Sequence, residues 1–138
     1  MTAETRSIEE SNTEVALNFI QHLAADTMEP SMMTEDFKVW TASHGEMEPS
    51  AWFAAVRALT NVLNEPLKST PIGVTAQGER VAIEAVSHGN LSNGEHYSNN
   101  YHFLVIVREG KVAQVKAYFS TRLAAEKLGP LFAAAAQS

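Results

Sequence analysis

The sequence contains no cysteine among its 138 residues, which excludes disulfides and thiolate metal sites. It also lacks any apolar run long enough to cross a bilayer as a helix. Residues 1–10 are polar and acidic, unlike the basic and then apolar start of a secretory signal. We therefore expect a cytoplasmic protein that does not insert into a membrane.

Basic residues are few and scattered along the chain. Ten Lys and Arg residues stand against 16 Asp and Glu residues, and the formal net charge is −6. Binding to nucleic acid requires a basic stripe that meets the phosphates, and an anionic membrane surface makes a similar demand. We expect neither nucleic acid nor a membrane as a partner.

Several motifs that carry chemistry are missing as well. The five histidines lack the spacing of a zinc-binding helix. The sequence has no glycine-rich loop that would cradle a phosphate and no G-x-S-x-G turn that would present a nucleophile. These absences predict no metal, no cofactor and no covalent catalysis.

What is present indicates one domain over residues 1–138, with 45% hydrophobic residues. Helical signals fall within residues 7–64. Ser7 and Glu10 have the spacing of a capping box, and a second helix opens at Pro49 and stops before Pro66. Both helices have a period of 3.6 residues in their apolar positions, which are Val15, Ala16, Phe19, Ile20 and Leu23 in the first and Trp52, Val56, Leu59 and Leu63 in the second.

The second half of the chain reads as strands. A short strand is expected at residues 37–41, and an antiparallel sheet lies mainly within residues 71–120. Turns at Gly78, at Asn93-Gly94 and at Gly110 divide it into long strands. A short helix over residues 121–128, closed by Gly129 and Pro130, completes an α+β fold rather than a doubly wound one.

Six segments in this order resemble the nuclear transport factor 2-like superfamily, in its SnoaL-like branch of proteins related to polyketide cyclases and ketosteroid isomerase. They are VALNFI at residues 15–20, EDFKVW at 35–40, GERVAI at 78–83, the Tyr97-x-Asn99-x-Tyr101 pattern, EGKV at 109–112 and KAYFST at 116–121. The resemblance implies a cone-shaped, curved antiparallel sheet wrapped around helices, with a deep apolar pocket. It also implies a homodimer formed through the outer face of the sheet.

The resemblance further implies which side chains face the pocket. Aligned with epoxide-hydrolase-like relatives, Glu84, Val86 and His88 point inward. Alternation along a strand places Tyr97, Asn99, Tyr101 and Phe103 on one face, and the alignment makes that face the inner one, together with Val115, Ala117 and Phe119. Relatives carry acidic groups on the last strand where this chain has Ala117 and Ser120, so a base must come from another element.

These residues suggest a cofactor-independent acid–base enzyme acting on a hydrophobic oxygenated small molecule, by isomerisation, cyclisation, dehydration or a lyase reaction. We expect His88 to act as general base or acid and Glu84 to orient it or share the proton. Tyr101 is expected to hold a substrate oxygen. Further substrate contacts are expected from Asn99, Trp40, His44, Tyr97, Phe103, Val115 and Phe119.

Other interpretations stay open. A glutamate such as Glu84 on a half-exposed strand is more often a solvated surface residue, His44 fits a solvated loop, and the tyrosines fit simple packing. The missing carboxylate on the last strand makes a non-catalytic ligand-binding or dimerisation module a real alternative. An epoxide hydrolase ranks third, because no Arg-x-Asp pair lies on the strand that carries Glu84.

Overall fold

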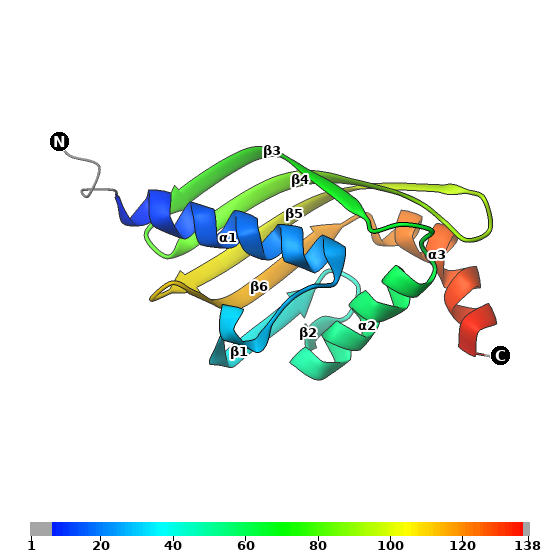
Figure 1. The fold of residues 1–138 in the computed structure, drawn as a ribbon, viewed down its shortest axis with the longest axis horizontal. Coiled ribbons are helices and arrows are strands. Elements are labelled where there is room, and N and C mark those ends of the chain that lie inside the picture. Colours follow the sequence, from blue (N-terminus) through cyan, green and yellow to red (C-terminus); the bar gives the residue numbers. More distant parts are fainter. Residues whose placement is uncertain (1–6, 137–138) are drawn as a thin grey trace.

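A computed structural model describes residues 7–136 of the chain. One helix lies across the concave face of a curved six-stranded sheet, and two more lie toward one end of it (Figure 1). The elements in chain order are α1 (Ile8–Ala25), the short 3-10 helix η1 (Pro30–Met32), β1 (Met33–Thr41), β2 (Gly45–Met47), α2 (Pro49–Asn61), β3 (Lys68–Gln77), β4 (Arg80–Asn90), β5 (His96–Arg108), β6 (Lys111–Phe119) and α3 (Thr121–Ala136).

The first helix forms where the sequence predicts it. The Ser7 hydroxyl accepts a hydrogen bond from the backbone N–H of Glu10 at 3.1 Å, which satisfies a donor that the first turn leaves without a partner. Ala16, Phe19 and Ile20 are buried against the sheet. The predicted helix start, with Ser7 as its N-cap, and the apolar period are therefore confirmed.

The sheet is mixed rather than wholly antiparallel. Its strand order is β2-β1-β6-β5-β4-β3. The predicted antiparallel meander is confirmed from β3 to β6, whereas β1 pairs with β6 in parallel. The expected α+β class with a curved sheet holds, and β1 begins at Met33 rather than at residue 37.

The last helix is longer than the sequence predicts. We expected it to end at Leu128, but α3 continues through Gly129 and Pro130 to Ala136. Proline inside a helix costs one backbone hydrogen bond. An alanine run with high helix propensity follows it, and Leu131 and Phe132 pack against a second hydrophobic cluster around Tyr97 and Leu128. Packing and propensity together offset the break.

Strand alternation sorts the side chains onto two faces. On β4 the buried positions are Val81, Ile83, Ala85, Ser87 and Gly89, and the positions between them are exposed or half-buried. The inner face and the helices enclose a core that includes Phe19, Phe37 and Trp52. Within residues 7–136, no helix combines the length and the apolar character needed to cross a membrane.

The turn between β4 and β5 sets the register of these two long strands. The Leu91 backbone N–H donates to the Glu95 carbonyl at 2.8 Å, and Gly94 adopts a left-handed φ of 89°. Three residues, 92–94, therefore form the loop, as in hairpins that combine a turn with a glycine of positive φ. Every cross-strand pair along β4 and β5 follows from this loop length.

Candidate ligand-binding pocket

A pocket of about 350 Å³ opens between the inner face of the sheet and the three helices. Its walls are mostly apolar. Leu23 comes from α1, Trp52 and Val56 from α2, and Phe103 and Phe119 from β5 and β6. A cavity of this size and lining is typical of sites for small organic molecules.

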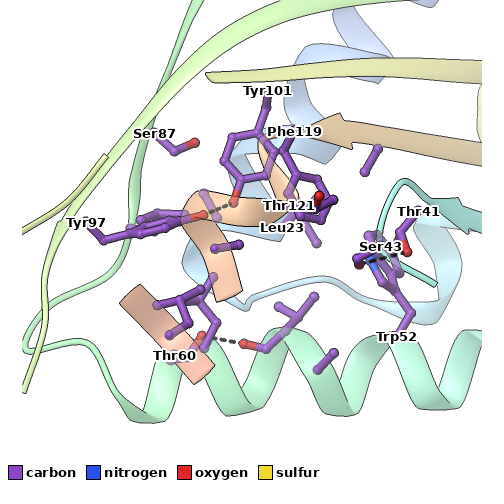
Figure 2. A pocket seen from close by; sticks show the side chains of 18 of the residues that line it. Leu23, Thr41, Ser43, Trp52, Thr60, Ser87, Tyr97, Tyr101, Phe119 and Thr121 are labelled. Atoms are coloured by element: carbon purple, nitrogen blue, oxygen red, sulfur yellow. Dashed lines mark hydrogen bonds between the residues drawn. The ribbon is translucent and has the colours of Figure 1, made fainter. Parts of the chain in front are cut away.

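Three polar side chains form a hydrogen-bonded chain on one wall. Asn99, only 3% exposed, accepts from the Ser120 backbone N–H at 3.2 Å through Oδ1. Its Nδ2 donates to the Ser120 carbonyl at 3.1 Å and to Tyr97 Oη at 2.9 Å. Tyr97 Oη lies 2.8 Å from Tyr101 Oη, and Figure 2 shows the two hydroxyls meeting beside the cavity.

This chain has a preferred direction. The amide nitrogen of Asn99 can only donate, so Tyr97 accepts from it. A hydroxyl that already accepts a hydrogen bond becomes a stronger donor, which favours Tyr97 donating to Tyr101. In that arrangement the hydrogen of Tyr101 is free to point at a ligand in the pocket.

Burial raises the pKa of Tyr101 far above its ordinary value, and the neighbouring Tyr97, through its charge and its hydrogen bond, raises it further. The phenol therefore stays protonated at neutral pH and well into the alkaline range. Tyr101 is equipped to donate a hydrogen bond and is unsuited to act as a base.

Two other polar groups face the same cavity. The hydroxyl of Ser87 donates to that of Ser69 at 3.2 Å, near the tyrosines. At the opposite side, where Figure 2 labels Thr41 and Ser43, the Ser43 hydroxyl lies 2.8 Å from His44 Nδ1. The His44 backbone N–H donates to Thr41 Oγ1 at 3.2 Å. His44 itself is exposed, so it lies at the mouth of the pocket.

The structure contradicts the inward placement of Glu84, Val86 and His88. Glu84 and His88 are exposed, and Val86 shares their face. Two-residue turns at Asn93-Gly94 would pair His88 with Asn99, but the three-residue loop pairs Ser87 with Asn99 and His88 with Ser98. A shift of one residue exchanges the two faces of a strand. Neither the carboxylate nor the imidazole reaches the pocket, and the catalytic roles assigned to them are wrong.

The other expected site residues divide into three groups. Tyr97, Tyr101, Phe103, Phe119 and His44 line the pocket. Asn99 lies behind them and reaches the cavity through Tyr97. Val115 faces inward but is buried in the core, and Trp40 lies on the outer face against Tyr118, with 5.0 Å between ring centroids. The pocket role expected of Trp40 is therefore wrong.

Several lining residues escaped the sequence analysis. Trp52, Val56 and Leu59 belong to the apolar period of α2, which reads as core packing. Ser69 precedes the expected start of the sheet at residue 71, and Ser87 lies on the face that was assigned outward. Residues of α3 such as Phe132 lie beyond the expected end of that helix. The sequence carries no signal for how α3 packs against the rest of the fold.

The lining defines which ligands the pocket suits. Among residues 7–136, the side chains that line it include hydroxyls and one imidazole but no carboxylate, lysine or arginine. A phosphate group or a metal ion would find no charged partner there. The donor set instead suits a neutral molecule with one or two oxygen atoms.

The sequence matches no protein-family model and no curated protein, but solved structures resemble the fold. A protein described as a SnoaL-like polyketide cyclase from Jannaschia sp. CCS1 is 20% identical, with a TM-score of 0.73, over 89% of this chain and 94% of that one. A nuclear transport factor 2-like protein from Anabaena variabilis is 22% identical, with a TM-score of 0.68, over 85% and 96%.

A third similar structure is an epoxide hydrolase of the LEH-like type from Mycobacterium tuberculosis. It is 13% identical, with a TM-score of 0.69, over 96% of this chain and 100% of that one. Reactions differ widely within one fold, so these likenesses establish architecture alone. The chain therefore has the nuclear transport factor 2-like fold, shared with SnoaL-like and ketosteroid isomerase-like proteins.

Proposed function

We propose that this chain binds a hydrophobic oxygenated small molecule in the pocket and that Tyr101 donates a hydrogen bond to its oxygen. The observation that carries the proposal is the 2.8 Å contact between the Tyr97 and Tyr101 hydroxyls in an otherwise apolar cavity. Burying a hydroxyl is costly unless it finds partners. A ligand carbonyl would accept the hydrogen bond that Tyr101, already accepting from Tyr97, can still donate.

Apolar area supplies the affinity in this proposal, and Tyr101 supplies the selectivity. Each square ångström of apolar surface removed from water is worth about 25 cal/mol. A hydrogen bond adds about 1 kcal/mol, which corresponds to roughly fivefold in affinity. The chain should therefore prefer a cyclic ketone to a hydrocarbon of the same shape.

Calorimetric titration with 2-tetralone and with tetralin tests this preference, because the two bicyclic probes differ mainly in one carbonyl. The wild type should bind the ketone about fivefold more tightly. Tyr101→Phe should bind both probes equally, while the matched control Glu84→Gln, altered on the outer face, should keep the preference. Equal binding of the two probes by the wild type would contradict the proposal.

A second candidate function, acid–base catalysis on the same ligand, is supported by His44. Among the described lining residues it is the one imidazole, and its Nδ1 contacts the Ser43 hydroxyl, so Nε2 is available to exchange a proton. His44 would remove a proton next to a carbonyl, and Tyr101 would donate to the developing enolate oxygen. His44 would thus take the role of base that was expected of His88 with Glu84.

Proton NMR of 2-tetralone in D₂O separates the two candidates. An enzyme would exchange the protons beside the carbonyl faster than buffer does, and His44→Gln would abolish the acceleration. Tyr101→Phe would slow it about 10²-fold or more, as loss of an oxyanion donor does. If the ligand binds but its protons exchange no faster than in buffer, the catalytic function is rejected and only the binding function remains.

A further inference from the structure

A pair of imidazoles lies outside the pocket, across the end of the β4–β5 hairpin. His88 Nδ1 and His96 Nε2 are 3.5 Å apart, and the two ring planes are inclined by 30° with centroids separated by 5.6 Å, so the rings meet at these nitrogens rather than face to face. Both side chains are exposed. Neither contributes to the pocket, so the proposed function leaves this pair unexplained.

The neighbours of His96 determine which of its nitrogens carries the proton. Asn90 Nδ2 donates to the Glu65 carboxylate at 3.2 Å, which orients the amide because a carboxylate only accepts. Asn90 Oδ1 lies 3.1 Å from His96 Nδ1 and must therefore accept from it. The Nε2 lone pair of His96 is thereby directed toward His88. A histidine held in one tautomer by an outer hydrogen bond is the arrangement that metal-ligating histidines adopt.

We propose that His88 Nδ1 and His96 Nε2 together bind one zinc ion at the end of the β4–β5 hairpin. Imidazole is a preferred zinc ligand, and Zn–N distances are about 2.0–2.1 Å. Two nitrogens 3.5 Å apart and both bound at that distance would subtend about 115° at the metal, close to the tetrahedral angle of about 109°. Square-planar binding would require the nitrogens to approach more closely.

Zinc binding requires one proton to move from Nδ1 to Nε2 of His88. In the free pair, His88 Nδ1–H donates to the lone pair on His96 Nε2. On binding, the proton of His88 transfers to its own Nε2, and both facing nitrogens then offer lone pairs to the ion. Residues 7–136 contain no group of three or more His, Asp or Glu side chains placed to hold a metal, so water completes the coordination.

The ion would join the two arms of the hairpin, and the hydrogen bond from Asn90 to Glu65 connects this site to a third segment of the chain. His88 and His96 belong to the two arms of the hairpin, and Glu65 lies in the connection between α2 and β3. Gly89, next to His88, packs against Leu63 and Leu67, which line the pocket. Zinc would therefore fix the end of the β4–β5 hairpin, which lies behind one wall of the pocket. Lys68 lies opposite His88 on β3 but is exposed, so its ammonium group can turn away into solvent.

Calorimetric titration of the tag-free full chain with zinc chloride tests the site. We expect one zinc per chain, a rise in the unfolding temperature on adding zinc, and at least tenfold weaker binding in both His88→Ala and His96→Ala. Asn90→Ala should weaken binding about tenfold, since it leaves both ligands in place but frees the tautomer of His96. His102→Ala is the matched control, because His102 lies on the same strand and face and contacts Tyr118 rather than this pair.

Three results would overturn the proposal. They are wild-type binding no tighter than that of His96→Ala, equal weakening in His102→Ala, and a stoichiometry of one zinc per two chains. Unfolding temperatures measured without zinc show whether each variant is folded. If His96→Ala proves unstable, Asn90→Ala tests the proposal in its place. Unchanged zinc affinity in that variant would contradict the role of the Asn90 amide.

Discussion

Ser87 lies directly opposite Asn99 in the antiparallel ladder of β4 and β5. Both side chains therefore enter the inner face of the sheet, where Ser87 lines the pocket and Asn99 supports the tyrosines. A loop shorter by one residue would put His88 in the place of Ser87. The chemistry available inside the pocket thus depends on a turn that lies outside it.

Replacing Asn99 with alanine should both destabilise the protein and disturb the pocket. The amide holds the backbone of Ser120, where β6 meets α3, and it donates to Tyr97. Losing these buried hydrogen bonds should lower the free energy of unfolding by about 1–3 kcal/mol. Urea denaturation measures the loss. The exposed neighbour Asn100 is the control, and Asn100→Ala should change stability by less than about 0.5 kcal/mol.

Gly89→Ala should push the pocket wall inward. A Cβ at this position would lie 2.6 Å from Leu63 Cδ2 and 3.1 Å from Leu67 Cδ1. Overpacking of this kind costs about 1–3 kcal/mol, and both leucines line the pocket, so affinity for 2-tetralone should also fall. Gly73→Ala is the control, because its Cβ would meet only the end of the Glu84 side chain. Equal effects of the two substitutions would contradict this packing argument.

The buried phenol of Tyr101 should make the protein sensitive to alkali. Its pKa in the folded state is raised above the ordinary value of 10.0 by burial, and then by Tyr97. Above pH 10 the unfolded chain releases this proton while the folded chain retains it, so stability falls as pH rises. The slope approaches about 1.4 kcal/mol per pH unit. Urea midpoints between pH 9 and 11 should therefore fall more steeply in the wild type than in Tyr101→Phe.

The expected homodimer through the outer sheet face remains a prediction. On that face Tyr118 contacts Trp40 and meets the ring of His102 edge-on. Aromatic residues of this kind are enriched at protein interfaces. Light scattering should give the mass of two chains for the wild type and of one chain for Tyr118→Arg. The control Ile8→Arg changes a more exposed apolar residue, on α1, and should stay dimeric. A monomeric wild type at high concentration would refute the interface.

Local patterns were enough to predict most of the elements. The capping pair of Ser7 and Glu10, the apolar period of α1 and the glycine turns depend on residues close together in the chain. The same holds for the shared face of Tyr97, Asn99 and Tyr101, because alternation within one strand needs no partner. Helix α3 was underestimated, since packing of Leu131 and Phe132 outweighs the local stop at Gly129 and Pro130.

By itself the sequence determined the α+β class, the order of the main helices and strands, and which residues of β5 share a face, because short-range periodicity encodes each of these; that this face points inward came from the resemblance to known proteins. Only the tertiary structure decided that Ser87 rather than His88 looks into the pocket, that Trp40 faces outward, and that α3 closes one end of the cavity. Each of these outcomes depends on how two segments meet. One residue more or less in a loop, or the packing of a helix end, changes which side chains face the pocket. The local sequence of either segment does not show that change.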